Sequence, residues 1–370
     1  MVLVSKLLSP SISDVSLVIP CNHSSEEFVA LLRAVFSGSL LPREILVIQS
    51  SSSRPTQKYS LSEALVNSLT ADELQKVNSV SIDIFDVDAA FPGEARNKGV
   101  NHARGDLIAF LDVKTIPEQH WLEEACEYLE DSDLDGVWGS RIYRSNTLLA
   151  GLIRDAIYGR LPVRSVAGSV FRRQVYSVTG QMISWAPAGE DGDWMHRVKA
   201  HKLSFLMPKK ANHSYLGLDD KPLSFFIKKW WRYYHYSRLL PVNNRDRWLS
   251  FGLLYIVLIF FAFNWNYKIS AAILGSPLVV PHITTGLAIA GPLAYVFIRG
   301  IYLPLRRGVP FQRILPARFV MVLLVASVLD FIKTLALLLP LPHERGAKER
   351  SWETVGSRTD IKQPVTSSEK

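Results

Sequence analysis

The sequence predicts an α/β domain built on a mainly parallel sheet, followed by a membrane-associated region. Short apolar runs rich in β-branched residues alternate with segments of helical spacing through the first half of the chain. A strand, a crossover helix and a further strand imply a parallel sheet that is covered on both faces. Beyond about Leu249 the chain becomes much more hydrophobic, and long apolar runs indicate membrane helices.

The expected strands follow one another at regular intervals, at residues 15–19, 44–48, 80–85 and 107–111. Helical spacing runs from Glu26 to Val35, and a further helix is expected from about Glu94 to Arg104. The stretch 136–207 adds shorter strands and a helix that begins near Glu190. A serine-rich loop, 50–59, is expected at the ligand-facing edge of the sheet.

Composition limits the class of protein. At 370 residues the chain can hold one large domain or two. Its two cysteines, Cys21 and Cys126, exclude a disulfide framework and fit a reducing compartment. The first twenty residues lack the pattern of a signal peptide, so we expect the bulk of the chain to be cytosolic.

Hydropathy divides the chain into four expected parts. These are a cytosolic α/β domain (1–220), an amphipathic interface segment (221–248), a membrane region (249–342) and a polar tail (343–370). The membrane region contains two or three expected spans, at about 249–265, 283–302 and 319–341.

The interface segment combines aromatic rings and cations. At 100° per residue one side of the predicted helix carries Phe226, Ile227, Trp230, Tyr233 and Tyr234, and the other carries Lys228, Lys229, Arg232 and His235. Such a helix suits a membrane interface. The alternative is an amphipathic helix packed on a soluble core.

Arginines predict the membrane orientation. Arg245 and Arg247 precede the first span, and the loop after the second span contains Arg299, Arg306, Arg307, Arg313 and Arg318. Both loops therefore belong on the cytoplasmic side, in a multi-pass protein of the cell (inner) membrane. This topology accounts for most of the net charge of +8, so no nucleic-acid partner is expected.

The third apolar run contains Asp330 and Lys333, which lie three residues apart. On a helix these two side chains can face and neutralise each other. The run either crosses the bilayer or lies along its surface. If it crosses, the tail lies outside, and its several cations fit that position poorly.

The expected strand 107–111 ends at Asp112, where open α/β folds hold their ligands. An acid two residues later would complete a metal-diphosphate motif, but Lys114 stands there. Ahead of this strand, the stretch PGEARNKG at 92–99 places glycines at a turn and Arg96 at the opening of a helix, which can hold an anion. Arg96 could equally be a structural ion-pair partner.

Several motifs in order carry a family resemblance. They are the strand and loop 14–22 with Pro20 and Asn22, the PGEARNKG stretch, the strand ending at Asp112 with Pro117 and Trp121 after it, Gly189-Glu190-Asp191 with Trp194, and Lys229 to Tyr233. This series resembles family 2 glycosyltransferases of the GT-A (Rossmann-like) fold over roughly residues 14–240. The membrane segments behind it resemble the integral-membrane branch that builds cell-surface glycans.

The resemblance implies inverting transfer of a sugar from a nucleoside diphosphate sugar to a lipid-linked or other glycan acceptor. Asp191 matches the base that deprotonates the acceptor hydroxyl, and Glu190 would orient acceptor or base. Without the resemblance, both read as first-turn acids favoured by the helix dipole. The implied donor-binding residues are Pro20, Asn22, Gln49, Arg96, Asn97, Asp112 and Lys114, and the implied acceptor or interface residues are Trp194, Trp231, Arg232 and Tyr233.

Two departures from the family pattern concern the donor site. Lys114 replaces the metal-binding acid, so it either neutralises the diphosphate itself or marks a decayed site. Asp112 and His213 are candidate ligands if Mg²⁺ or Mn²⁺ binds, although a lone histidine after a strand is more often structural. Gln49 and Arg54 replace acids, and a glutamine amide can still bind a nucleotide base.

Two hypotheses follow. The protein is a membrane-anchored glycosyltransferase, or it is a catalytically degenerate relative that serves as a scaffold or partner subunit. The sequence does not select a donor sugar or an acceptor.

Overall fold

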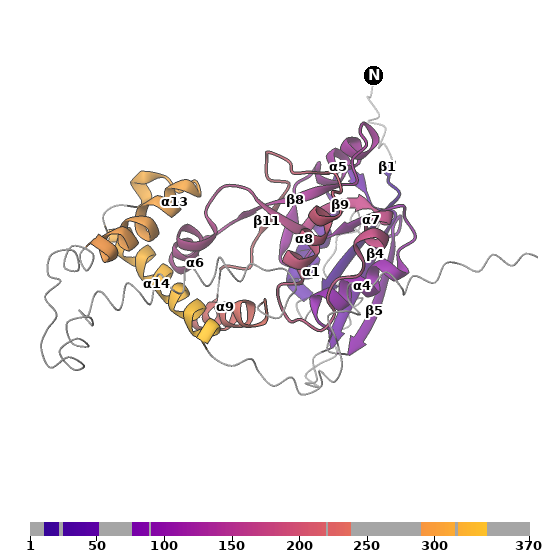
Figure 1. Cartoon of the computed structure of the whole chain (residues 1–370). Coiled ribbons are helices and arrows are strands. Elements are labelled where there is room, and N and C mark those ends of the chain that lie inside the picture. The colour runs from indigo at the N-terminus through magenta and orange to yellow at the C-terminus, as the bar shows by residue number, and fades with distance from the viewer. Residues whose placement is uncertain are drawn as a thin grey trace, which may run out of the picture.

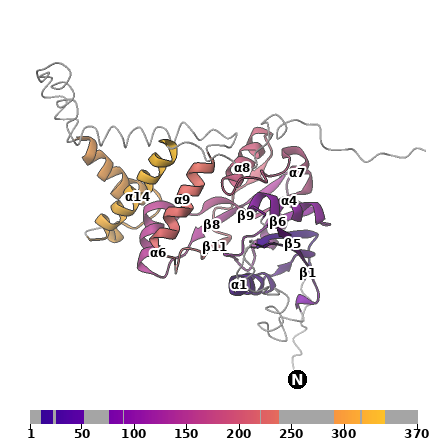
Figure 2. The same ribbon diagram turned by 90° about the horizontal axis from the view of Figure 1, so that it is seen from below.

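The computed structural model describes residues 11–21, 25–51, 76–88, 90–219, 221–237, 290–314 and 317–338. A sheet with helices on its faces forms one part, and helices α6, α9, α13 and α14 gather beside it (Figures 1 and 2). Asn22 and the first apolar run, 249–265, lie outside the described residues, as do residues 52–75, which include most of the expected serine-rich loop, and the tail.

Among the described residues the main sheet has nine strands, in the order β5-β4-β2-β6-β9-β8-β11-β7, with β10 paired to β8. Its first four strands are parallel: β2 (Val15–Cys21), β4 (Glu44–Ser51), β5 (Ser81–Asp88) and β6 (Leu107–Phe110). Here the predicted parallel arrangement is confirmed. The remaining strands are β7 (Thr115–Pro117), β8 (Gly136–Tyr143), β9 (Val163–Arg172), β10 (Phe205–Leu206) and β11 (His213–Tyr215).

The second half of the sheet is not parallel throughout. Strand β9 runs antiparallel to both of its neighbours, β6 and β8, and β11 is antiparallel to β7. The sheet is therefore mixed. A separate parallel pair joins β1 (Ser11–Ile12) to β3 (Leu40–Leu41).

Helices cover both faces of the sheet. On one face lie α1 (Ser25–Phe36) and α5 (Trp121–Glu130), and on the other lie α4 (Pro92–His102), α7 (Arg173–Thr179) and α8 (Glu190–Ala200). The helices beside the sheet are α6 (Leu148–Ile153), α9 (Leu223–Ser237), α13 (Leu303–Arg306) and α14 (Ala317–Leu338) (Figure 1). Shorter turns of helix are η1 (Arg154–Tyr158), η2 (Ile298–Tyr302) and η3 (Phe311–Arg313).

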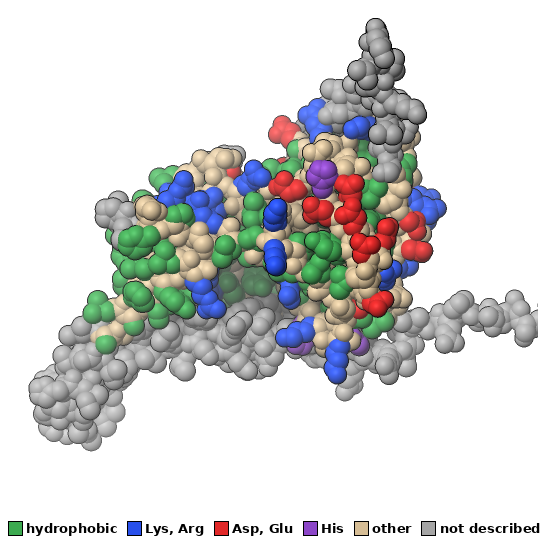
Figure 3. Space-filling model, turned by 90° about the horizontal axis from the view of Figure 1, so that it is seen from above, with side chains coloured by type: hydrophobic (Ala, Val, Ile, Leu, Met, Phe, Trp, Pro, Cys, Tyr) green, Lys and Arg blue, Asp and Glu red, His purple; other side chains and the backbone are tan. Residues whose placement is uncertain are grey.

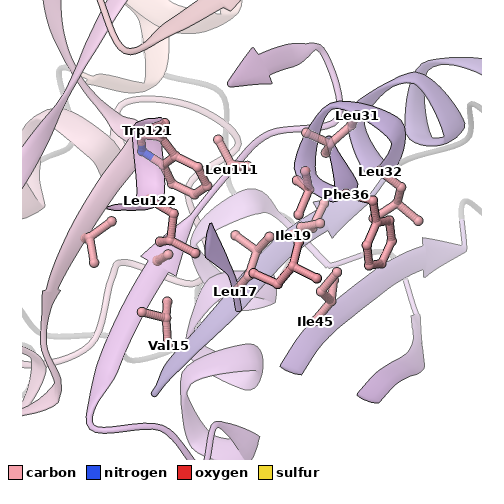
Figure 4. Packing of buried hydrophobic residues seen from close by; sticks show 14 of the residues in the cluster. Val15, Leu17, Ile19, Leu31, Leu32, Phe36, Ile45, Leu111, Trp121 and Leu122 are labelled. Carbon is pink, nitrogen blue, oxygen red and sulfur yellow. The ribbon is translucent and has the colours of Figure 1, made fainter. Parts of the chain in front are cut away.

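Each face of the sheet has its own core. Leu17 and Ile19 of β2 point toward helices α1 and α5, where they meet Leu32 and Trp121 (Figure 4). Val18, between them in sequence, packs on the other side against residues of α4, α7 and α8. Because both faces are buried, the central strands are continuous apolar runs rather than alternating ones.

The glycines of PGEARNKG serve packing inside helix α4, not a turn before it. A Cβ at Gly99 would lie 2.3 Å from Cγ1 of Val18, and one at Gly93 would lie 2.2 Å from the carbonyl oxygen of Ile183. The predicted turn is therefore wrong, because the helix already begins at Pro92. Its close approach to β2 and to the 183 segment requires residues without side chains.

Helix α9 packs on α14 through an apolar face that includes Phe226 and Trp230. Two predicted side assignments are wrong: His235 is buried and its ring stacks on Trp231 at 5.2 Å, whereas Tyr233 is 40% exposed. The apolar face of α9 therefore packs against protein, as in the alternative of an amphipathic helix packed on a soluble core.

Arg299 was predicted in a loop, but it lies in η2 and is buried against α14. Its Nε lies 2.6 Å from Oδ2 of Asp330, and Nζ of Lys333 lies 3.4 Å from Oδ1 of the same carboxylate. The predicted facing of Asp330 and Lys333 is confirmed, with Arg299 as an additional partner.

Within the described residues, one helical stretch has the length and apolarity of a membrane span. It runs from Arg318 to Ala336 in α14, has a mean hydropathy of 2.2, and has 44% of its residues buried inside the structure. The second expected run is described only from residue 290 onward, where it is helical.

Candidate active site

Four charged side chains from three segments meet at the ligand-facing edge of the sheet. Asp112 follows strand β6, Glu190 and Asp191 open helix α8, and Arg96 projects from α4. Nη2 of Arg96 lies 2.8 Å from Asp112 Oδ1. Nη1 lies 2.8 Å from Asp191 Oδ1 and 3.2 Å from Glu190 Oε1.

Arg96 is an internal partner of these carboxylates rather than an exposed donor-binding cation. Its side chain is only 3% exposed, and its guanidinium also lies 5.8 Å from the ring centroid of Phe110. These contacts are the ones expected if Arg96 is a structural ion-pair partner. A single guanidinium thus joins Asp112 to two acids that lie 78 and 79 residues later in the chain.

The carboxylates differ in their affinity for a proton. Burial raises the pKa of Glu190, the charge of Asp191 adds to this effect, and the resulting pKa is about 7. Burial also raises the pKa of Asp191, although Arg96 opposes it. Burial alone would raise the pKa of Asp112, but the charges of Arg96 and Arg141 bring it below the ordinary value. Near neutrality Glu190 is thus partly protonated, whereas Asp112 is ionised.

This shift predicts a pH dependence of stability. The pKa of Glu190 is raised in the folded state, so its contribution is present below the unfolded pKa and is lost as the pH rises through about 7. Relative to Glu190→Gln, the wild type should lose up to about 3 kcal/mol between pH 5 and 8, at about 1.4 kcal/mol per pKa unit. Thermal unfolding of both proteins across this range measures the difference, and parallel curves would contradict it.

Arg141 is a cation of this site that the sequence did not single out. It lies on β8, and its guanidinium is 5.2 Å from the ring centroid of Tyr143 and 5.7 Å from that of Tyr215. Its charge lowers the pKa of Asp112. The buried Nε has no hydrogen-bond partner among the described residues. Arg141 belongs to no motif quoted above, and only the position of β8 places it near Asp112.

Two predicted contact residues are structural. Nδ2 of Asn97 donates to the carbonyl oxygen of Met182 at 2.8 Å, and its Oδ1 accepts from the Met182 amide at 2.8 Å and from the Tyr176 hydroxyl. Trp194 is fully buried, and its Nε1 donates to Thr179 Oγ1 at 3.0 Å. These side chains position the segments around the site, so neither the donor role of Asn97 nor the acceptor role of Trp194 fits the geometry.

The residues present do not fit a divalent metal ion. His213 is fully buried, with its Nδ1 2.8 Å from Asn212 Oδ1 and its Nε2 3.2 Å from Ser165 Oγ. Burial lowers its pKa to about 3, so the ring is neutral but engaged. Oδ1 of Asp112 is held by Arg96, and the described residues contain no cluster of three metal-ligating side chains. Lys114, being a cation, adds no ligand.

The other predicted donor residues lie at the same edge. Pro20, one residue before the end of β2, pairs with Ile48 of β4, and Gln49 of β4 pairs with Cys21 and with Asp86 of β5. Nζ of Lys114 lies 3.6 Å from Glu27 Oε1 at the start of α1, and its side chain is 31% exposed. Asp86, an exposed acid beside Gln49, belongs to none of the sequence motifs.

Helix α9 carries a tyrosine on which the charges of the site act. Burial raises the pKa of Tyr233, and the charges of Asp191 and Glu190 raise it further. Trp231 is half-buried and Arg232 is exposed on the same helix. Nζ of Lys229 lies 3.3 Å from the hydroxyl of Tyr215 and 5.3 Å from its ring centroid.

A comparison with solved structures finds several that are similar to this chain. A mannosyltransferase, PcManGT from Pyrobaculum calidifontis in complex with GDP-Man and Mn²⁺, is 13% identical with a TM-score of 0.51, over 86% of this chain and 87% of that chain. S. aureus TarS is 12% identical with a TM-score of 0.41, over 86% of this chain and 54% of TarS, so the chain spans about half of its length. The S. aureus TarS fragment 1–349 in complex with UDP-GlcNAc is 12% identical with a TM-score of 0.41, over 86% and 90%.

A comparison with curated protein sequences finds no match. Residues 16–155 match the family model described as Glycosyl transferase family 2. This match covers β2, α4, β6 and β8, and with them Arg96, Asp112, Lys114 and Arg141. The expected GT-A fold is confirmed, with a mixed sheet. The chain therefore carries a glycosyl transferase family 2 domain, a domain of sugar-transferring enzymes, at residues 16–155.

Proposed function

We propose that the protein is a membrane-anchored inverting glycosyltransferase that moves a sugar from a nucleoside diphosphate sugar to a lipid-linked or other glycan acceptor at the cytoplasmic face. The observation that carries this proposal is the group of carboxylates around Arg96. Asp191 is 35% exposed while Glu190 beside it is 7% exposed. One acid therefore reaches the ligand side and the other supports it.

In the proposed reaction Asp191 is the general base. It takes the proton of the acceptor hydroxyl, whose oxygen bonds to the anomeric carbon as the bond from that carbon to the diphosphate oxygen breaks. Arg96 keeps Asp191 in place, and protonated Glu190 reduces the negative charge that Arg96 must balance. Attack from the face opposite the diphosphate inverts the anomeric configuration.

The leaving diphosphate needs positive charge, which we assign to Lys114 and Arg141. Hydrogen bonds from the backbone amide and Oγ1 of Thr115 to the Asp112 carbonyl oxygen close a turn around Lys114. The charge of Arg141 already acts on Asp112 and Asp191. A cation placed where charge develops stabilises a departing anion without a metal ion.

A second candidate function is a non-catalytic scaffold or partner subunit. Gln49 and Lys114 favour it, since both replace acids in the donor region. The base segment favours the enzyme, because Glu190 and Asp191 both persist next to Arg96.

Donor binding separates these functions. Calorimetry of the full chain in neutral detergent, with UDP-GlcNAc and GDP-Man as probes and with or without Mn²⁺, should show binding of at least one donor without metal. UDP and GDP alone serve as controls for the diphosphate contribution. Absence of binding to any nucleotide sugar under both conditions would exclude the enzyme.

Lys114→Asp should make both donor binding and transfer depend on added Mn²⁺. The substitution removes a cation from the diphosphate and supplies the acid that a divalent ion requires. Metal-free activity should fall by about 100- to 1000-fold, on the scale of one lost transition-state contact. Lys209→Asp, at an exposed lysine away from the site, is the matched control. Unchanged metal-free activity in the Lys114 variant would remove the proposed role.

A further inference from the structure

Three arginines surround a single buried carboxylate in the helical part of the molecule. Asp155 lies in η1 and is 1% exposed. Its carboxylate oxygens lie 3.1 Å from Arg154 Nε, 3.2 Å from Arg160 Nε and 3.1 Å from Arg318 Nη2. We call Arg154, Arg160, Arg313 and Arg318 the arginine cluster.

The four arginines of this cluster carry more positive charge than the single carboxylate of Asp155 can neutralise. The side chains of Arg154, Arg160 and Arg318 are only 11%, 24% and 25% exposed, so water screens them incompletely. Burial lowers the pKa of Arg154, and the neighbouring charges of Arg160 and Arg313 lower it further. The buried Nε of Arg318 has no hydrogen-bond partner among the described residues. Partly buried guanidinium groups in excess of their carboxylate favour an anion beside them.

Helical elements from the middle of the chain and from its C-terminal third build this surface. Arg307 Nη1 donates to the carbonyl oxygen of Ala156 at 2.9 Å, and its own carbonyl oxygen accepts from the amides of Arg160 and Leu161. A Cβ at Gly151 would lie 2.8 Å from Arg318 Nη2, so α6 approaches that guanidinium closely. The cluster therefore has a fixed geometry rather than being a run of solvated charges.

Large apolar side chains are exposed on the elements that carry the cluster. Leu161 is 53% exposed, Phe311 is 54% exposed and Leu148 is 63% exposed. Figure 3 shows hydrophobic and basic side chains sharing the surface of this part of the molecule, whereas most acids gather over the sheet. Binding of a free phosphate or of a polyanion would not explain why leucine and phenylalanine side chains are exposed next to the arginines. A phospholipid surface accounts for both.

We propose that the arginine cluster binds the phosphate of an anionic phospholipid at the cytoplasmic membrane surface, with Leu161 and Phe311 in contact with its acyl chains. This inference rests on the membrane anchoring in the proposed function and adds the lipid class and the residues that recognise it. The Arg318 end of α14 then lies at headgroup depth, where a helix that enters the bilayer begins.

Native mass spectrometry of the full chain in neutral detergent tests the site. Phosphatidylglycerol should bind more tightly than phosphatidylcholine, by roughly fivefold for each arginine engaged. Arg160→Gln/Arg313→Gln/Arg318→Gln should remove that preference. The matched control is Lys199→Gln/Lys209→Gln/Lys210→Gln, which removes the same charge from exposed positions on the sheet domain and should keep it.

A single variant guards against misfolding of the triple variant. Arg313 is exposed and forms no ion pair with another described residue, so Arg313→Gln should fold normally and lose roughly fivefold of the preference. Equal binding of the two lipids by the wild type, or equal losses in the cluster and control variants, would overturn the proposal. Full competition by millimolar inorganic phosphate would also overturn it, since it would indicate a site for free phosphate.

Two further measurements separate this proposal from the proposed function. Flotation with phosphatidylcholine vesicles tests anchoring itself, and donor binding in the same preparations tests the transferase site. If the protein floats with vesicles and binds donor but shows no preference between the two lipids, only the proposed lipid site is overturned. If the protein does not float with vesicles, the membrane anchoring on which the lipid site rests is overturned.

Discussion

Replacing Asp191 by asparagine is expected to reduce sugar transfer by about 10²- to 10⁴-fold, the contribution of a positioned general base. The amide keeps the size of the side chain and an oxygen toward Arg96, which lies 2.8 Å from the present carboxylate, but it cannot accept the acceptor's proton. Donor binding should stay within about threefold, because the base acts only after the donor is bound. Transfer rates with saturating donor, together with calorimetric donor affinity, measure both effects.

Asp193→Asn is the control for the helix-dipole interpretation of these acids. Asp193 lies in the same first turn of α8, but its carboxylate is 2.9 Å from Nε of Arg197 and is buried. Its loss should lower thermal stability and leave the transfer rate of the folded protein within a few fold. If the two variants lose transfer equally, Asp191 is a structural acid and the proposed base is wrong.

Replacing Arg96 by leucine is expected to destabilise the fold by about 3–5 kcal/mol, the usual cost of removing one partner of a buried ion pair. Leucine would leave Asp112, Glu190 and Asp191 without the cation that now holds all three. Their mutual repulsion would raise their pKa values, so the loss should be smaller at pH 5, where they take up protons, than at pH 8. Thermal or denaturant unfolding at both pH values measures the effect.

The Arg43–Asp14 pair supplies a matched control for Arg96→Leu. It has the same 2.8 Å separation, but its side chains are 53% and 47% exposed. Arg43→Leu should therefore cost less than about 1 kcal/mol. Similar losses in the two variants, or a loss in Arg96→Leu that does not depend on pH, would show that Arg96 acts through packing rather than charge.

The parts of the fold that local sequence encodes were predictable. Val15 to Ile19 and 107–111 are continuous apolar runs, and such runs mark strands buried on both faces. The antiparallel insertion of β9 between β6 and β8 was not predictable, because it joins residues more than 60 positions apart along the chain. Hydrophobic periodicity identifies the buried face of an element but not its neighbour in the sheet.

The candidate site shows the same division. Asp112, Glu190 and Asp191 were found through motifs, and the structure places them around one guanidinium. Which arginine holds them was left open, because ion pairing depends on the docking of α4 and α8. Arg141 was missed for the same reason, and Asn97 was assigned to the donor because its bonds to Met182 and Tyr176 are tertiary.

The orientation of α9 could not be taken from its sequence alone. Helical periodicity grouped His235 with the cations, yet it stacks on Trp231 and is buried. Lys333 of α14 also lies 5.2 Å from the ring centroid of Tyr234, so cations take part in the contact between the helices. The simple division into apolar and charged sides therefore fails at His235, which is buried, and at Tyr233, which is exposed.

Helix α9 has a consequence for the choice of acceptor. One side of it packs on α14, while the charges of Asp191 and Glu190 act on Tyr233 of the same helix. In the proposed membrane arrangement, the width of a single helix, about 10 Å, thus separates the base from the apolar layer. The protein would then select acceptors by the distance of the reacting hydroxyl from the membrane surface. A hydroxyl close to the acceptor's lipid anchor would reach Asp191, whereas the far end of a long glycan would extend beyond it.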